Sequence, residues 1–464
     1  MKTFRTFATV TRPCADGRRR ATLLAAALLF ALLPARAARA QDTDRTDPQM
    51  TNTPPPVYVI RNARVVTVSG ADIENGAVVI SGGRITAVGA SVTAPAGAQE
   101  IDARGLTVYP GMIDLGTQMG LNEVSSVGAT IDTQELGDMN PNAAAVWAVN
   151  PSSSHIAVTR VEGVTSVLSL PSGGTISGQA AFINLAGSSP REMAVAPTAA
   201  LVVNFPLIGG GGFGAFQLAQ QGITPDAITQ RDRRIEELRR MLRDAEAYGR
   251  AQDAYAKDPK SVPRPPTDLK LAALVPYVRG ERPVIFRAER ERDIRAAVRF
   301  AEETKLKAVI IGGSESGRAA QFLKEHNVPV ILDSVLNLPL REDDPYDSLY
   351  ENAAKLQAAG VRFCISTGDS GAHVRDLPFQ AGMAAAYGLP KAEALKAVTI
   401  YPAQILGVAD RVGSIEQGKL ANLVVTDGDL LEARTHVRYL FINGRQIPLV
   451  SRHTMLYDQF KDRK

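Results

Sequence analysis

Short runs of apolar and β-branched residues alternate with turn residues at both ends of the chain. The first runs are VYVI, ARVVTV, AVVI, RITAV and QEIDA, separated by Ser-Gly, Asn-Gly and Gly-Gly pairs. Runs of this length and composition predict the strands of a small antiparallel sheet. The same pattern returns in NLVVTDGD and VRYLFINGRQI near the C-terminus. We therefore expect residues 56–106 and 411–450 to form one small β-sandwich from the two chain ends.

The middle of the chain, residues 107–410, alternates short apolar runs with stretches of helical period. An α/β fold, a (β/α)8 barrel, is predicted by eight buried-type strands with helices between them. In such a barrel, the side chains that bind small molecules lie at the C-terminal ends of the strands. The runs expected to be strands are 109–115, 164–170, 180–184, 200–205, 284–287, 308–311, 329–332 and 362–367.

The clearest helix is predicted over residues 226–256. Its stretch from 231 to 244 contains six arginines, but also four acidic residues. Because the acids offset the positive charge, the pattern favours a solvated helix face over a nucleic-acid-binding surface.

The first 40 residues have the layout of an export signal. Three arginines at 18–20 precede an apolar run at 21–33, and small residues precede Gln41. The run is shorter than the ~20 residues of a transmembrane helix, so we favour a cleaved signal peptide over an N-terminal membrane anchor. Residues 41–55 are polar and predict a disordered leader. The mature protein is expected in the periplasm or outside the cell, without a stable membrane anchor.

The net charge of the chain is explained by this segment. The formal charge is +4, but residues 1–40 carry eight basic residues and one acid, so the remainder carries −3. This balance removes the case for nucleic acid or anionic lipid as a partner. Of the two cysteines, only Cys364 follows the signal, which excludes a disulfide scaffold and a cysteine-built zinc site. A small-molecule ligand is expected, and a homo-oligomer is compatible with the sequence.

Three stretches resemble the amidohydrolase superfamily, and particularly its imidazolonepropionase-like, exported members. They are VIRNARVVTVSG with RITAVG, TVYPGMIDLGTQMGL at 107–121, and the stretch 366–429 that begins STGDSGAH. The resemblance implies hydrolysis of a carbon–nitrogen bond other than a peptide bond in a small substrate, such as a cyclic amide. It also implies one or two divalent metals, such as zinc, that activate a water molecule.

The sequence departs from the family at most positions that would ligate the metal. The histidine pair after the first strand is replaced by Gly116 and Gln118, and the strand-five histidine position falls on Arg287. The strand-six position falls on Gly312 or the next glycine, and only Asp369 matches a ligand. Since a first-row metal needs about three or four N, O or S donors, we predict no metal and no other cofactor.

Five residues are candidates for the site. Asp369 and His373 are the candidate catalytic residues, as general base and acid–base partner, and Gln118, Glu123 and Arg287 are candidates for substrate binding. Arg287 could pair with Asp369 in place of the metal. Each of these residues also has a purely structural interpretation. Two functions stay open: a hydrolase, and a metal-free, catalytically inactive homologue that binds a small ligand or a partner.

Residues 451–464 are expected to form a C-terminal tail.

Overall fold

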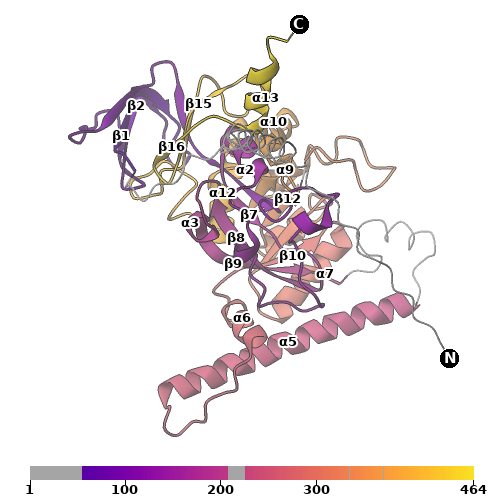
Figure 1. The fold of residues 1–464 in the computed structure, drawn as a ribbon. Coiled ribbons are helices and arrows are strands. Elements are labelled where there is room, and N and C mark those ends of the chain that lie inside the picture. Colours follow the sequence, from indigo (N-terminus) through magenta and orange to yellow (C-terminus); the bar gives the residue numbers. More distant parts are fainter. Residues whose placement is uncertain (1–54, 207–224, 334, 369, 464) are drawn as a thin grey trace, which may run out of the picture. The chain divides into compact units, whose positions relative to one another are not determined.

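Two eight-stranded sheets organise the described part of the chain (Figure 1). The computed structural model describes residues 55–206, 225–333, 335–368 and 370–463. The predicted export signal, nearly all of the predicted leader and Asp369 therefore lie outside the described residues. Within the described ranges, no helix combines the length and the apolar character needed to cross a membrane.

One of the two sheets is built from strands of both chain ends. β5 joins the two ends, because it pairs in parallel with β1 and antiparallel with β14. All eight strands are hydrogen-bonded into a single sheet, so the division into two facing layers stays a prediction. The strands are β1 (Tyr58–Val65), β2 (Ile73–Ser81), β3 (Arg84–Gly89), β4 (Gln99–Asp102), β5 (Thr107–Pro110), β14 (Leu423–Thr426), β15 (Val437–Ile442) and β16 (Arg445–Ile447).

The other sheet is built by the middle of the chain, and its eight strands follow one another in chain order. The predicted strand 109–115 is divided at Gly111, where a Cβ would lie 2.1 Å from the Thr165 hydroxyl. Its first part is β5, and its second part opens the barrel sheet. The strands are β6 (Met112–Thr117), β7 (Val164–Ser169), β8 (Ile176–Asn184), β9 (Ala194–Asn204), β10 (Val284–Ala288), β11 (Ala308–Gly312), β12 (Val330–Asp333) and β13 (Phe363–Ser366).

The direction of β8 departs from the (β/α)8 expectation. β8 pairs antiparallel with both β7 and β9, whereas every other neighbouring pair of the path is parallel. The reason lies in the connection from β7 to β8, which spans residues 170–175 and turns at Gly173 and Gly174, both with positive φ. A connection this short permits only antiparallel pairing, since a parallel crossover needs a dozen residues or more.

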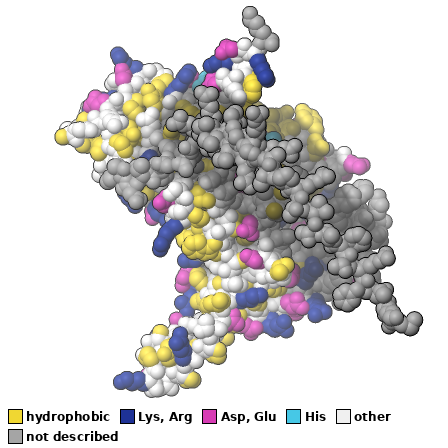
Figure 2. Space-filling model, viewed as in Figure 1, with side chains coloured by type: hydrophobic (Ala, Val, Ile, Leu, Met, Phe, Trp, Pro, Cys, Tyr) yellow, Lys and Arg dark blue, Asp and Glu magenta, His cyan; other side chains and the backbone are white. Residues whose placement is uncertain are grey.

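The helices pack around the barrel sheet, and the predicted helix 226–256 is confirmed as α5. Leu238, Leu242 and Ala245 of α5 are buried, while ion pairs such as Arg233 with Glu237 lie on its exposed side. Basic and acidic side chains are intermixed over this helix (Figure 2). The helices are α2 (Ser154–Arg160), α3 (Pro190–Met193), α5 (Pro225–Lys257), α6 (Leu269–Val278), α7 (Glu291–Glu303), α8 (Ala320–Glu325), α9 (Asn352–Ala358), α10 (Leu377–Ala386), α11 (Lys391–Ala397), α12 (Ile400–Leu406) and, in the predicted tail, α13 (Arg452–Phe460).

The inner face of the barrel sheet changes from apolar to polar toward the C-terminal strand ends. Alternate residues of several strands, among them Ile285, Ile311 and Ile331, form one buried apolar cluster. Because side chains alternate between the two faces of a strand, the residue two positions further along each strand lies on this same face. Arg287 follows Ile285, and Asp333 follows Ile331. The barrel mouth thus carries a charged layer above an apolar floor.

Side chains close the barrel sheet between its first and last strands. The carboxylate of Asp114 on β6 accepts hydrogen bonds from the hydroxyls of Ser366 (2.7 Å) and Thr367 (2.6 Å), at the end of β13. These contacts bring the two ends of the strand path together, and the sheet forms a nearly closed barrel.

Candidate functional site

An ion pair at the barrel mouth is the centre of the candidate site. Nη1 of Arg287, on β10, donates to Oδ2 of Asp333, at the end of β12, over 3.2 Å. The intervening strand β11 ends in Gly312, and Gly313 follows it, so no side chain separates the pair. The Arg287 side chain is 42% exposed and the Asp333 side chain 15%. The guanidinium can therefore be reached by a ligand, whereas most of the carboxylate is enclosed.

Asp333 is in an unusual electrostatic environment. Its Oδ1 is buried and accepts no hydrogen bond from the described residues. Burial raises the pKa of Asp333 to about 7; Arg287 opposes this shift, and the negative charges of Glu289 and Asp114 add to it. A carboxyl group with a pKa near neutrality can take up and release protons under ordinary conditions.

Asp114, on β6, is close enough to Asp333 to act on its pKa, and its own contacts are those of a structural residue. It is fully buried, and besides Ser366 and the Thr367 hydroxyl it binds the backbone N–H groups of Gly116 (2.8 Å) and Thr367 (3.1 Å). Burial raises the pKa of Asp114, and these hydrogen bonds oppose the shift. A carboxylate with four donors is held rigidly, which suits a structural role in closing the barrel.

Cys364 does not qualify as a nucleophile. Its side chain is fully buried on β13. Burial raises the pKa of the thiol well above its usual value, and the nearby carboxylates of Asp114 and Asp333 raise it further. A thiol in this state is inert at neutral pH, because the thiolate is the reactive form.

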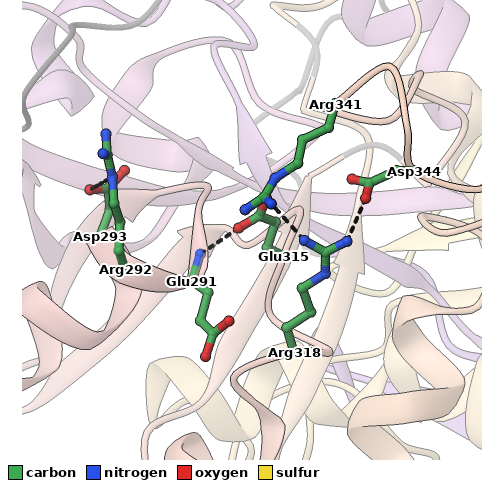
Figure 3. Close-up of polar contacts among 7 residues, drawn as sticks. All are labelled: Glu291, Arg292, Asp293, Glu315, Arg318, Arg341 and Asp344. Atoms are coloured by element: carbon green, nitrogen blue, oxygen red, sulfur yellow. Dashed lines mark hydrogen bonds and ion pairs between the residues drawn. The ribbon is translucent and has the colours of Figure 1, made fainter.

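The loops that follow β10, β11 and β12 are tied together beside the mouth (Figure 3). The buried carboxylate of Glu315 accepts hydrogen bonds from the backbone N–H of Glu291 (2.9 Å) and from Nε of Arg341 (2.8 Å). Arg318 pairs with Glu315 at 3.6 Å and with Asp344. One carboxylate therefore links all three loops.

A second link leads from these loops to the ion pair. Ser314, after β11, donates from its hydroxyl (2.7 Å) and its backbone N–H (3.2 Å) to Glu289, after β10. Glu289 is one of the charges that act on Asp333. A cavity of about 500 Å³ lies between the second and third of these loops, lined among others by Ser314, Arg318 and Lys355.

Comparison with known proteins shows which family has this architecture. A sequence model of the amidohydrolase family matches residues 295–448. The chain is 27% identical to an amidohydrolase of known structure from Thermotoga maritima, with a TM-score of 0.74, over 84% of this chain and 99% of the other. It is 26% identical to amidohydrolase tasK of Hapsidospora irregularis over 80% of this chain.

The chain belongs to the amidohydrolase superfamily.

Other matches are shorter or more distant. The matched region spans 39% of the length of the relative tasK. A stretch of 37 residues is 51% identical to N-acetylglucosamine-6-phosphate deacetylase of Haemophilus influenzae, covering 8% of this chain and 10% of the relative. The structure of a molinate hydrolase, at 17% identity and a TM-score of 0.50 over 86% of this chain and 96% of the other, shows similarity of fold alone.

The described residues do not fit the metal centre of the superfamily. At Gly116, where the first histidine of the superfamily would stand, a Cβ would lie 2.1 Å from the Ser366 hydroxyl and 2.7 Å from Oδ1 of Asp333. No side chain fits there unless its neighbours move. At the strand-five position Arg287 presents a guanidinium, which repels a cation. Among the described side chains, no group of three or more His, Cys, Asp or Glu residues is arranged to hold a metal ion.

Two of the residues predicted to bind the substrate, Gln118 and Glu123, follow the first strand of the barrel sheet. Gln118 directly follows β6 and is half-buried. The Glu123 carboxylate accepts from Ser153 (2.9 Å) and from Asn150 (3.3 Å), within the loop region after β6.

His373 and Asp369 lie on the segment after β13. His373 is 63% exposed and pairs with Asp376 at 3.2 Å. Asp369 lies outside the described residues, so its pairing with Arg287 stays a prediction, as do the roles assigned to these residues. The described partner of Arg287 is Asp333.

Sequence reasoning missed Asp333. The predicted strand ended at residue 332, one residue short of the observed end of β12. A signal was present, since an aspartate two positions after a buried isoleucine shares its face of the strand. The alternation of the strand, continued by one residue, would have placed a carboxylate at the mouth.

Proposed function

We propose that the protein hydrolyses a carbon–nitrogen bond other than a peptide bond in a small molecule that binds at the barrel mouth. The observation that carries this proposal is the Arg287–Asp333 pair, which combines an accessible cation with a carboxyl group of pKa about 7. It lies at the C-terminal strand ends, where barrel enzymes bind their substrates. Superfamily membership supports the reaction class, and cyclic amides are the substrates that we would test first.

We also propose a more detailed description of the two sheets. We interpret the barrel sheet as a (β/α)8 barrel in which β8 has reversed its direction, and the second sheet as the β-sandwich that accompanies such barrels in the family. Both interpretations extend the coarser result of a nearly closed barrel and a second sheet.

A second candidate function is binding without turnover. It is favoured by Gly116 and Arg287, which occupy positions where the superfamily places metal ligands. In this case the mouth would bind a small ligand, or a partner, without chemistry. The two functions share the site and differ only in whether a product is released.

The place of action is proposed to be the periplasm or the cell exterior, on the basis of residues 1–40. Fractionation of cells that express the full chain tests this proposal. Mature protein starting at Gln41 in the periplasm or medium is the expected result, and full-length protein in the membrane fraction would contradict it.

A substrate panel tests the proposed reaction. Purified mature protein is incubated with cyclic amides, imidazolones, N-acyl amino acids and dipeptides, and products are followed by mass spectrometry. Ligand binding is measured on the same compounds by thermal unfolding. Release of an amine and a carboxylate supports hydrolysis, whereas a stabilising compound that stays intact supports the binding function.

A further inference from the structure

We infer that Asp333 and Arg287 perform the hydrolysis without a metal, with Asp333 transferring the proton of the attacking water and Arg287 holding the carbonyl oxygen. This inference rests on the proposed function, because it assigns a mechanism to that same site. The inference goes beyond the proposed function because it names two side chains that would take the place of the metal of the superfamily.

The position of the two side chains supports these roles. Both come from the inner face of the barrel sheet, on β10 and β12, and they contact each other over 3.2 Å. Oδ1 of Asp333 is enclosed against β6 and β13, since it lies 2.7 Å from the site of a Cβ at Gly116. Proton exchange with the mouth is therefore expected at Oδ2, the atom that Arg287 also contacts.

Arg287 has donors to spare for a substrate. A guanidinium carries five N–H groups, and one of them donates to Asp333. Its other N–H groups contact no acceptor in the described part of the chain. Since the side chain is 42% exposed, a carbonyl oxygen can approach it from the mouth. The positive charge would then stabilise the negative charge that develops on this oxygen as the water attacks.

Burial, together with the negative charges nearby, makes Asp333 a stronger base than an exposed aspartate, although Arg287 opposes this. It is faced by Arg287 and Glu289 from β10 and the loop after it, by Asp114 from β6, and by the thiol of Cys364 from β13. One cation stands against two further carboxylates, and Oδ1 has no donor to stabilise the charged form. The carboxylate therefore binds a proton more readily than an exposed aspartate does.

The reaction balances with these two groups alone. The water oxygen forms a bond to the carbonyl carbon, its proton passes to Asp333, and the π electron pair moves to the oxygen held by Arg287. When this pair returns, the carbon–nitrogen bond breaks, and the nitrogen takes the proton from Asp333. The products are a carboxylic acid and an amine, and Asp333 regains its charge.

The experiment compares chelator-treated wild type with Asp333→Asn and Arg287→Lys on the best substrate of the panel, between pH 5 and 9. Asp427→Asn is the matched control, because Asp427 also pairs with an arginine, Arg438, but in the second sheet. We expect wild-type kcat/KM to survive metal removal and to rise toward a plateau as the pH passes about 7. In Asp333→Asn, kcat/KM should fall about 100-fold or more, and its rise with pH should disappear.

Arg287→Lys keeps the charge but not the planar fork, so kcat should fall at least ten-fold while KM changes less. Thermal unfolding curves and circular dichroism spectra that match those of the wild type establish that each variant folds. If Asp333→Asn does not fold, Arg287→Lys still tests the inference. Turnover that is lost on metal removal and restored by zinc would overturn the inference but leave the proposed function standing. Activity retained in both variants would do the same. The absence of turnover on every substrate, with or without added metal, would overturn the proposed function and this mechanism with it.

Discussion

Thr367 donates two hydrogen bonds to Oδ2 of Asp114, from its backbone N–H at 3.1 Å and its hydroxyl at 2.6 Å, although the two residues are 253 positions apart. The pair joins the first strand of the barrel sheet to the segment that follows its last strand. Strand pairing connects every other neighbour along the sheet path, so closure at this seam relies on side chains. A single buried carboxylate therefore holds the two ends of the barrel sheet together.

Removal of this carboxylate should destabilise the protein strongly. Asp114→Ala leaves the donors of Ser366 and Thr367 buried without an acceptor, at a cost of about 3 kcal/mol or more. The measurement is the free energy of unfolding in urea. Asp102→Ala is the matched control, because Asp102 also accepts bonds from two side chains, Asn62 and Arg104, but at an exposed site. Its removal should change the stability much less, because the partners of Asp102 are in contact with water, and equal losses in the two variants would contradict the role given to Asp114.

Gly116 should resist even the smallest side chain. In Gly116→Ala the new Cβ would overlap the Ser366 hydroxyl at 2.1 Å, so Ser366 and its neighbours must shift, at a cost of about 1–3 kcal/mol. Gly128→Ala is the control, since a Cβ at Gly128 meets nothing within 4 Å. Adding Ser366→Ala to Gly116→Ala should restore part of the loss. A double variant that is no more stable than expected from independent effects would argue against the overlap.

The sequence predicts the strands of the barrel more readily than their directions. The run 308–311 is continuous and apolar because both faces of this strand are buried, and this signal is local. The reversal of β8 depends on the short turn at Gly173 and Gly174, and a pattern of apolar runs alone does not reveal strand direction. The direction of β8 can be deduced only when the length of the connection from β7 is considered, because so short a connection excludes parallel pairing.

The site was less predictable than the fold. Arg287 could be placed at the mouth because it stands at the end of an apolar run. The properties of Asp333 could not, since its pKa depends on Glu289 and Asp114, which the fold brings together from separate strands. The contact between Gly116 and Ser366 is equally long-range. Such relationships follow from packing and leave no trace in the local pattern.

Glu315 should control the order of the three loops beside the mouth. Its side chain is 4% exposed and is the shared acceptor for Arg341 and the backbone of Glu291. Glu315→Ala should cost about 2–3 kcal/mol, because two donors lose a buried charged acceptor. Hydrogen exchange should accelerate in residues 335–351 more than in the second sheet. Glu246→Ala, which removes an exposed ion pair with Arg250, should change stability by less than about 0.5 kcal/mol. Unchanged exchange in the loop would contradict the linking role.

The stability of the protein should fall as the pH rises through the range in which Asp333 ionises. In the unfolded chain an aspartate has a pKa of about 3.9, and in the fold that of Asp333 is about 7. Between these values the folded state binds more protons, so the contribution of Asp333 to stability is complete below about pH 4 and is lost by about pH 7. Asp333→Asn removes this contribution. Its stability relative to wild type should therefore rise between pH 4 and 7, by an amount on the order of 2–4 kcal/mol.

Asp427→Asn provides a comparison, because the pKa of Asp427 is shifted in the opposite direction to that of Asp333. The backbone N–H of His436 lowers the pKa of Asp427, and Arg438 contributes to the shift, so that carboxylate stabilises the fold above its unfolded pKa and the effect is lost in acid. Urea unfolding of wild type and both variants at pH 4, 5.5, 7 and 8 separates the two cases. Between pH 4 and 8 the difference between the wild-type and Asp427→Asn curves should stay nearly constant, because the contribution of Asp427 is lost only below the unfolded pKa of about 3.9. A constant difference between wild type and Asp333→Asn across this range would show that Asp333 ionises normally in the fold. It would then lack the raised pKa on which its proposed role as proton acceptor depends.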